Sequence, residues 1–140
     1  MNVETRLSGR CHCGHVTWAA NGAPVWSAIC HCEDCRRAAS APMVGWLGVK
    51  TSDLTWSGPL RRYQSSALAE RGFCNDCGAP LLFENPTRWA GETYLYAPTL
   101  DDPTDFHPEC HLYVNEKLPW VHVSDGLPQF DAPDRMVDGT

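Results

Sequence analysis

The cysteines constrain this chain more than any other feature, because eight of them occur in 140 residues. Seven stand in close groups, which are Cys11 with Cys13, Cys30 with Cys32 and Cys35, and Cys74 with Cys77. Such groups can place several sulfurs on one tetrahedral ion, since Zn–S bonds are about 2.3 Å long. Glycine follows both Cys13 and Cys77, and it permits the left-handed turn that points backbone N–H groups at the sulfurs. The spacing therefore predicts metal centres.

The spacing also divides the seven cysteines into a set of three and a set of four. The set of three is compact enough in sequence to bind one ion alone, and it consists of Cys30, Cys32 and Cys35. The set of four closes a second site across the chain, and it consists of Cys11, Cys13, Cys74 and Cys77. A closed site of four ligands is structural, whereas three ligands leave a position for water or substrate. We therefore expect two zinc ions per chain, one structural and one of the catalytic type.

Other uses of these cysteines stay open at this point. Cross-paired disulfides are the main alternative, although a Cys-x-Cys pair is too close to bridge internally without strain. An iron–sulfur cluster is a third interpretation, although no fourth cluster ligand is evident. The three-cysteine set can also consist of free thiols that are only partly loaded with metal. Cys110 stands apart from the groups, and we interpret it as a packed thiol that behaves as a small hydrophobe.

Charge and hydropathy exclude several classes of partner. The chain carries 11 Lys and Arg against 17 Asp and Glu, which gives a net charge of −6. Nucleic-acid backbones and anionic membranes both require clustered positive charge, so neither is expected as a partner. No apolar run is long enough to cross a bilayer, and the first residues lack an apolar signal region. We therefore expect the cytoplasm, where clustered cysteines more often bind metal than form disulfides.

The apolar segments are short, rich in β-branched and aromatic residues, and separated by glycine and proline, with 11 of each. This pattern predicts a mainly β fold of two packed sheets. We expect strands near residues 16–18, 25–29, 43–47, 60–63, 81–83, 93–96, 112–114 and 120–123. One short helix is expected at residues 33–39. The chain is expected to form a single domain over residues 1–140, with its core at about 7–130 and a loose tail at 131–140.

Three cysteine motifs resemble those of the glutathione-dependent formaldehyde-activating enzymes, also called the centromere protein V/GFA family. They are G-R-C-H-C-G-H-V at residues 9–16, C-H-C-E-D-C-R-R at 30–37 and R-G-F-C-N-D-C-G at 71–78. Shorter segments are similar to the closing part of the family, and they are L-D-D-P at 100–103, H-L-Y-V at 111–114, L-P-W at 118–120 and D-G-L-P at 125–128. The likeness covers about residues 7–130 and is closest to the short branch of the family.

The resemblance implies a β-tent fold, similar to that of Rab exchange factors, with two or three antiparallel sheets around a four-cysteine zinc. It implies the same division into a structural and a catalytic zinc. It also implies carbon–sulfur lyase chemistry like that of S-(hydroxymethyl)glutathione synthase, which joins glutathione and formaldehyde. The partner would then be a small-molecule thiol or carbonyl compound, with glutathione among the candidates.

Three side chains are candidates for catalysis beside the metal ligands. His31 lies between two predicted ligands, and the roles of ligand, proton shuttle and packed residue are all open. Arg36 follows Cys35 and can bind a substrate carboxylate, with a surface ion pair as the alternative. His111 matches a position of the family, where it can line the pocket, with a buried core histidine as the alternative.

Two other functions compete with the enzyme. A zinc-stabilised binding or scaffold module would have no catalysis and would need only the four-cysteine site, so the three-cysteine set favours an enzyme. That enzyme can also act on another small-molecule substrate. A methionine sulfoxide reductase would need a reactive cysteine late in the chain, and the surroundings of Cys110 do not resemble such a segment.

Overall fold

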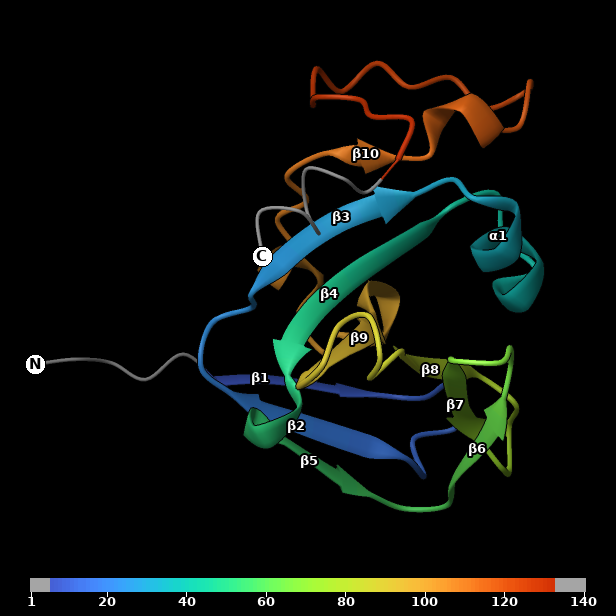
Figure 1. The fold of residues 1–140 in the computed structure, drawn as a ribbon. Coiled ribbons are helices and arrows are strands. Elements are labelled where there is room, and N and C mark those ends of the chain that lie inside the picture. Colours follow the sequence, from blue (N-terminus) through green and yellow to red (C-terminus); the bar gives the residue numbers. More distant parts are fainter. Residues whose placement is uncertain (1–5, 133–140) are drawn as a thin grey trace, which may run out of the picture.

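The computed structural model describes residues 6–132, which form a three-stranded sheet, a seven-stranded sheet and one α-helix (Figure 1). The smaller sheet has the order β1-β2-β5 and is antiparallel throughout. Its strands are β1 (Arg6–Arg10), β2 (Thr17–Asn21) and β5 (Leu54–Ser57). The prediction of a mainly β fold with two sheets is therefore confirmed.

The larger sheet has the order β10-β3-β4-β9-β8-β7-β6. Its strands are β3 (Trp26–Cys30), β4 (Val44–Lys50), β6 (Leu60–Gln64), β7 (Glu70–Cys74), β8 (Pro80–Glu84), β9 (Glu92–Tyr96) and β10 (His111–Leu112). Short 3-10 helices are η1 (Thr51–Asp53), η2 (Ala97–Thr99), η3 (Pro103–Asp105) and η4 (Val114–Glu116). All neighbouring strands are antiparallel except β10, which runs parallel to β3. The chain therefore returns late to the strand that carries Cys30.

The main core lies between the two sheets. Buried side chains alternate along β1 and β2 with exposed or half-buried ones. The core includes Leu7, Trp18, Ala20, Leu47, Val49, Leu95 and Leu100. Trp18 is 2% exposed, and its indole Nε1 donates a hydrogen bond of 3.0 Å to Thr99 Oγ1. A Cβ at Gly9 would lie 2.3 Å from that indole, so only glycine fits opposite this tryptophan.

The helix α1 occupies Glu33–Ala39, as predicted. Its start is capped by Cys32, whose Sγ accepts a hydrogen bond of 3.2 Å from the backbone N–H of Cys35. Acidic residues occupy the first turn and basic residues the last, which suits the helix dipole. Ser40 ends the helix with a left-handed φ of 51°. These local signals explain why the sequence alone placed the helix.

The expected strand at residues 120–123 is wrong, because this segment is a turn followed by irregular chain. Trp120 is 65% exposed, and Val121 N donates to Leu118 O at 3.0 Å. The Lys117 ammonium donates to Val121 O at 2.6 Å, so a side chain replaces the strand partner of that carbonyl. Strands β1, β5 and β7 were not expected from the sequence.

The end of the described chain runs beside β10. His111 N donates to Pro128 O, and Phe130 N donates to His111 O, both at 2.9 Å. Residues 133–140, which make up most of the expected tail, lie outside the described residues. Within residues 6–132, no helix is both long enough and apolar enough to cross a membrane.

Candidate metal centres

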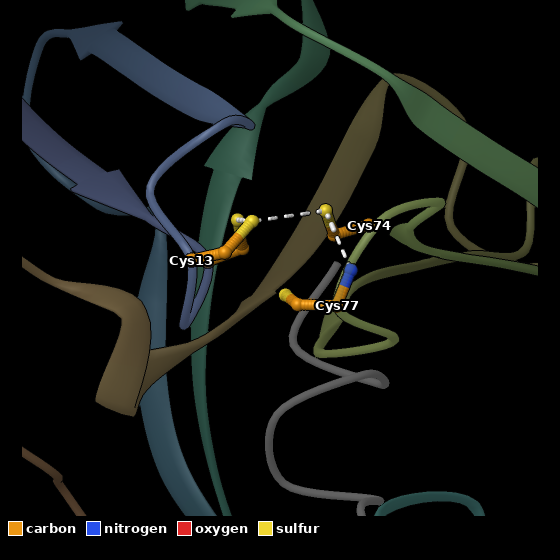
Figure 2. Close-up of side chains that lie close together, drawn as sticks. Cys13, Cys74 and Cys77 are labelled. Carbon is orange, nitrogen blue, oxygen red and sulfur yellow. Dashed lines mark hydrogen bonds between the residues drawn. The ribbon is translucent and has the colours of Figure 1, made fainter.

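The four-cysteine centre joins a turn of the small sheet to a turn of the large one. Its sulfurs belong to Cys11, Cys13, Cys74 and Cys77, and all four lie within 4.8 Å of one another. Cys13 Sγ is 3.6 Å from Cys11 Sγ and 3.8 Å from Cys74 Sγ. Cys13 on one turn faces Cys74 and Cys77 on the other (Figure 2). Two sulfurs on a tetrahedral zinc are about 3.8 Å apart, so this donor set fits the ion.

Both turns point backbone N–H groups at the sulfurs. Val16 N donates to Cys11 Sγ at 3.3 Å, and Cys77 N donates to Cys74 Sγ at 3.4 Å. Backbone hydrogen bonds from Ala79 and Cys13 lower the pKa of the Cys77 thiol to about 6. Such bonds favour the thiolate, which is the form that binds metal.

The two cysteine turns have the same backbone shape, and a side-chain contact joins one turn to the other. Gly14 and Gly78 have φ of 83° and 77°, in the left-handed region that glycine adopts without strain. His15 Nδ1 and Asp76 Oδ2, one from each turn, lie 2.7 Å apart on the surface. The glycines therefore have the role expected from the sequence.

The three-cysteine cluster lies where β3 meets α1. Cys30 ends β3 and is buried, Cys32 caps the helix, and Cys35 lies on its first turn. Their sulfurs lie within 4.8 Å of one another, and within residues 6–132 no histidine, aspartate or glutamate joins the group. Soft thiolate donors suit zinc, and three of them leave one coordination position free.

The three thiols of the cluster differ in pKa. Hydrogen bonds from Cys30 and Cys32 lower the pKa of Cys35 to about 3, with Trp46 and the Arg71 charge adding to the effect. Hydrogen bonding to Cys32 and Cys35, together with burial, raises the pKa of Cys30. The cluster therefore holds negative charge on Cys35, as a cation-binding site requires.

Arg71 on β7 supports this cluster, and sequence reasoning did not assign it a role. Its side chain is 3% exposed, and its guanidinium donates to Asp34 Oδ2 at 2.8 Å and to the Tyr96 hydroxyl at 2.9 Å. It also lies over the ring of Phe83, 4.8 Å from the centroid. Arg71 thereby fixes the first turn of α1 against the large sheet. Its place at the start of the R-G-F-C-N-D-C-G motif was the available signal in the sequence.

The three-cysteine cluster opens onto a cavity of about 390 Å³. This volume is at the small end of ligand pockets, which span about 300–1,000 Å³. Six aromatic side chains line it, and they are Trp26, Trp46, Phe83, Trp89, Tyr94 and Tyr113. A second hollow of about 540 Å³ contains Cys11 and His12 but none of the three clustered cysteines. The first cavity is therefore the one that a substrate of the cluster would enter.

His31 and His111 meet in a buried chain of hydrogen bonds. His31 Nε2 lies 2.8 Å from His111 Nδ1, and His111 Nε2 lies 2.7 Å from Asp125 Oδ2. A carboxylate only accepts hydrogen bonds, so His111 Nε2–H donates to Asp125. With one proton on each ring, His31 Nε2–H then donates to His111 Nδ1. Burial lowers the pKa of His31, which keeps this ring neutral. Its Nδ1 has no hydrogen-bond partner among the described residues.

Arg36 braces the same region from the helix. Its Nε donates to His31 O at 3.0 Å, and its Nη2 donates to Glu116 O at 3.2 Å. Neither Arg36 nor the two histidines line the 390 Å³ cavity. The structure therefore brings the three predicted catalytic side chains together behind the cluster, and a catalytic role for them stays a prediction.

Known proteins similar to this chain include two sequence relatives and a solved structure. A putative glutathione-dependent formaldehyde-activating enzyme of Halomonas elongata is 28% identical over 130 residues, which cover 84% of this chain and 80% of that protein. An uncharacterized lyase of Schizosaccharomyces pombe is 36% identical over 56 residues, which cover 40% of this chain and only 41% of the yeast protein.

The solved structure of a Rhodobacter sphaeroides protein has a TM-score of 0.55 and 20% identity, and the match covers 88% of this chain and 98% of that one. This likeness shows a shared fold. A family profile described as glutathione-dependent formaldehyde-activating enzyme matches residues 6–116 of this chain, and these residues include both cysteine clusters. The chain therefore belongs to the glutathione-dependent formaldehyde-activating enzyme family.

Proposed function

We propose that this protein is a zinc-dependent carbon–sulfur lyase-type enzyme that joins and separates a small thiol and a carbonyl compound. The observation that carries the proposal is the three-cysteine cluster, which opens onto a cavity and has no fourth protein ligand within residues 6–132. Membership of a formaldehyde-activating family supports the same chemistry. Glutathione and formaldehyde are the substrates that the family description suggests.

The reaction is an addition in which all atoms are retained. The thiol sulfur forms a bond to the carbonyl carbon, the C=O bond becomes C–O–H, and the thiol proton ends on that oxygen. A thiol with a pKa of about 8.5 is mostly protonated near pH 7, so little of the nucleophilic thiolate is present without catalysis. A zinc ion held by Cys30, Cys32 and Cys35 would supply an open position that acidifies a thiol or polarises a carbonyl oxygen.

Residues of the protein line the proposed reaction site and position its cysteines. Aromatic walls around the cluster exclude water and strengthen electrostatic interactions there. Arg71 offsets the negative charge of the cysteines and fixes the helix that carries Cys35. His31, Arg36 and His111 hold the Cys30–Cys32 segment from behind, which supports a positioning role for them.

We infer that the chain is a single domain and that it works in the cytoplasm, where thiols remain reduced. The net charge of −6 is consistent with a small-molecule partner rather than a nucleic acid. A pure binding module would need only the four-cysteine centre, so the second cluster favours an enzyme.

Exchange NMR of glutathione with formaldehyde tests the proposal. We expect zinc-loaded protein to accelerate the interconversion, and Cys32→Ser to abolish the acceleration while the four-cysteine centre keeps its zinc. Cys110→Ala is the control, because Cys110 lies outside both clusters. If protein with two zinc ions accelerates neither this exchange nor that of simpler thiols with carbonyl compounds, the proposed function is wrong.

A further inference from the structure

The cavity at the three-cysteine cluster has one continuous aromatic wall. Trp26 meets Tyr94 edge-on with ring centroids 4.6 Å apart, and Phe83 stacks on Tyr94 at 6.0 Å. Trp89 adds a further ring 5.5 Å from that of Tyr94. These rings come from β3, β8, β9 and the loop between the last two. A wall of this kind favours a flat apolar group through ring stacking and area burial.

The charged side chains of this cavity are mostly committed to other contacts. Arg71 already binds Asp34 and the Tyr96 hydroxyl. Glu116 Oε1 accepts a hydrogen bond of 2.8 Å from Glu33 N. Arg88 differs, because within the described part of the chain its guanidinium forms no ion pair and lies 4.8 Å over the ring of Trp89. One cation therefore remains for a ligand in this cavity.

A second polar group beside Arg88 also lacks a partner. The indole Nε1 of Trp89 is buried and makes no hydrogen bond to any described residue. Buried donors are nearly always satisfied by protein, water or a ligand, because leaving one unpaired is unfavourable. This nitrogen has almost no accessible surface, so it is closed to a ligand in the open cavity, and Arg88 is left as the partner of an anionic group there.

We infer that this cavity selects a compact thiol or carbonyl compound that consists of an aromatic ring and one carboxylate. The ring packs on the wall formed by Trp26, Tyr94 and Phe83, the carboxylate binds Arg88, and the sulfur or carbonyl group faces the three cysteines. Glutathione fits this lining less well, because it has no ring and carries two carboxylates and an ammonium. The inference rests on the proposed function for the reacting group and names its substrate class.

Calorimetric titration of the zinc-loaded protein tests this inference. The probes are para-(mercaptomethyl)benzoate, benzyl mercaptan, which lacks the carboxylate, mercaptoacetate, which lacks the ring, and glutathione. We expect the affinity for the aromatic acid to exceed that for each other probe by about tenfold or more. One charge-assisted hydrogen bond or one buried ring contributes enough free energy for such a difference. Its advantage over benzyl mercaptan should shrink at high salt, because Arg88 is exposed.

Two variants assign the contacts. Arg88→Gln should weaken the aromatic acid about tenfold and leave benzyl mercaptan unchanged. Arg61→Gln, at an exposed position on β6 outside the cavity, is the matched control and should change nothing.

The outcomes separate this inference from the proposed function. If glutathione binds as tightly as the aromatic acid, or if Arg88→Gln weakens benzyl mercaptan equally, the inferred substrate class is wrong. If glutathione exchange with formaldehyde is accelerated but the aromatic acid does not bind, the proposed function stands and this inference falls. If the acid binds through Arg88 but no thiol reacts with any carbonyl compound, the inference stands and the proposed function falls.

Discussion

His31 Nε2 lies 2.8 Å from His111 Nδ1, although the two residues are 80 positions apart in the chain. The bond joins the segment between two clustered cysteines to the strand β10, and Asp125 continues it toward the surface. Because both rings are buried, loss of either ring removes a hydrogen bond that water cannot readily replace, and the support of the cysteine segment is weakened.

Replacing His111 should therefore destabilise the protein. His111→Phe keeps a similar volume but leaves the Nε2–H of His31 buried without an acceptor, which costs about 1–3 kcal/mol. Denaturant unfolding of the zinc-loaded protein measures the change. His122→Phe, at an exposed position, should alter stability by less than about 0.5 kcal/mol. Equal effects of the two substitutions would contradict the role of the buried pair.

Acid should weaken the same contact through Asp125. Hydrogen bonds from the His111 side chain and the Leu127 backbone lower the pKa of Asp125 below 3.8. A group whose pKa is lower in the folded state stabilises the fold above its unfolded pKa of about 3.9, and this contribution is lost as the pH falls through the folded pKa.

Asp125→Asn removes this titration and retains an acceptor oxygen. The stability advantage of wild type over the variant should be constant near neutral pH and shrink below about pH 4. Urea unfolding of both proteins across this range, down to the lowest pH at which both still hold their zinc, measures the difference. An advantage that grows in acid would show that the assigned hydrogen bonds are wrong.

Cys74→Ser should unfold most of the protein and remove one zinc ion per chain. A structural zinc contributes about 10–16 kcal/mol to folding in zinc-finger peptides, which is as much as the whole stability of a typical domain. Zinc content by mass spectrometry and thermal unfolding test this. Cys110→Ala should keep both ions. Unchanged zinc content and thermal stability in Cys74→Ser would remove the structural role from this centre.

Cys32→Ser should have a narrower effect, because serine is a good helix N-cap. The hydroxyl can take over the hydrogen bond from Cys35 N, so α1 should remain folded. We expect zinc content to fall from two ions per chain to one, with near-ultraviolet circular dichroism close to wild type. A global loss of structure in this variant would mean that the three-cysteine cluster is structural too.

Replacing Gly58 tests how closely the turn after β5 packs on the turn before β2, and Gly91 is the control. A Cβ at Gly58 would lie 1.9 Å from His15 O, whereas a Cβ at Gly91 would meet nothing within 4 Å. Both glycines have positive φ, at 99° and 78°, so alanine is strained at either position. Gly58→Ala should cost about 1–3 kcal/mol more than Gly91→Ala, because backbone atoms must move. Equal unfolding free energies would contradict this packing.

Local chemistry explains what the sequence predicted correctly. The grouping of the cysteines depends on short spacings, and α1 depends on a cap and charges within a few residues of its ends. The strands that were missed depend on partners elsewhere. In β7, Gly72 lies under Leu82 of the neighbouring strand, where a Cβ would come within 2.8 Å of that side chain. A glycine and an arginine in sequence do not reveal such a strand.

In the candidate site, too, the sequence did not reveal features that depend on distant partners. Its cysteines could be chosen from their spacing, but the contact of Arg71 with Asp34 and Tyr96 joins three separate elements. The roles of His31 and His111 stayed open because neither residue reveals the other in the sequence. Side chains that act through distant partners become visible only when the sheet order is known.

The late return of β10 to β3 sets an order of assembly during synthesis. The four-cysteine centre is complete once the chain has grown past Cys77, whereas the support behind Cys30 and Cys32 needs residues as far as Asp125. Domains fold as units, and β9, which joins β4 to β8, also follows Cys77, so a metal ion can occupy the four-cysteine centre before the domain as a whole is stable. The support behind the three-cysteine cluster would then be the last part of the site to be completed.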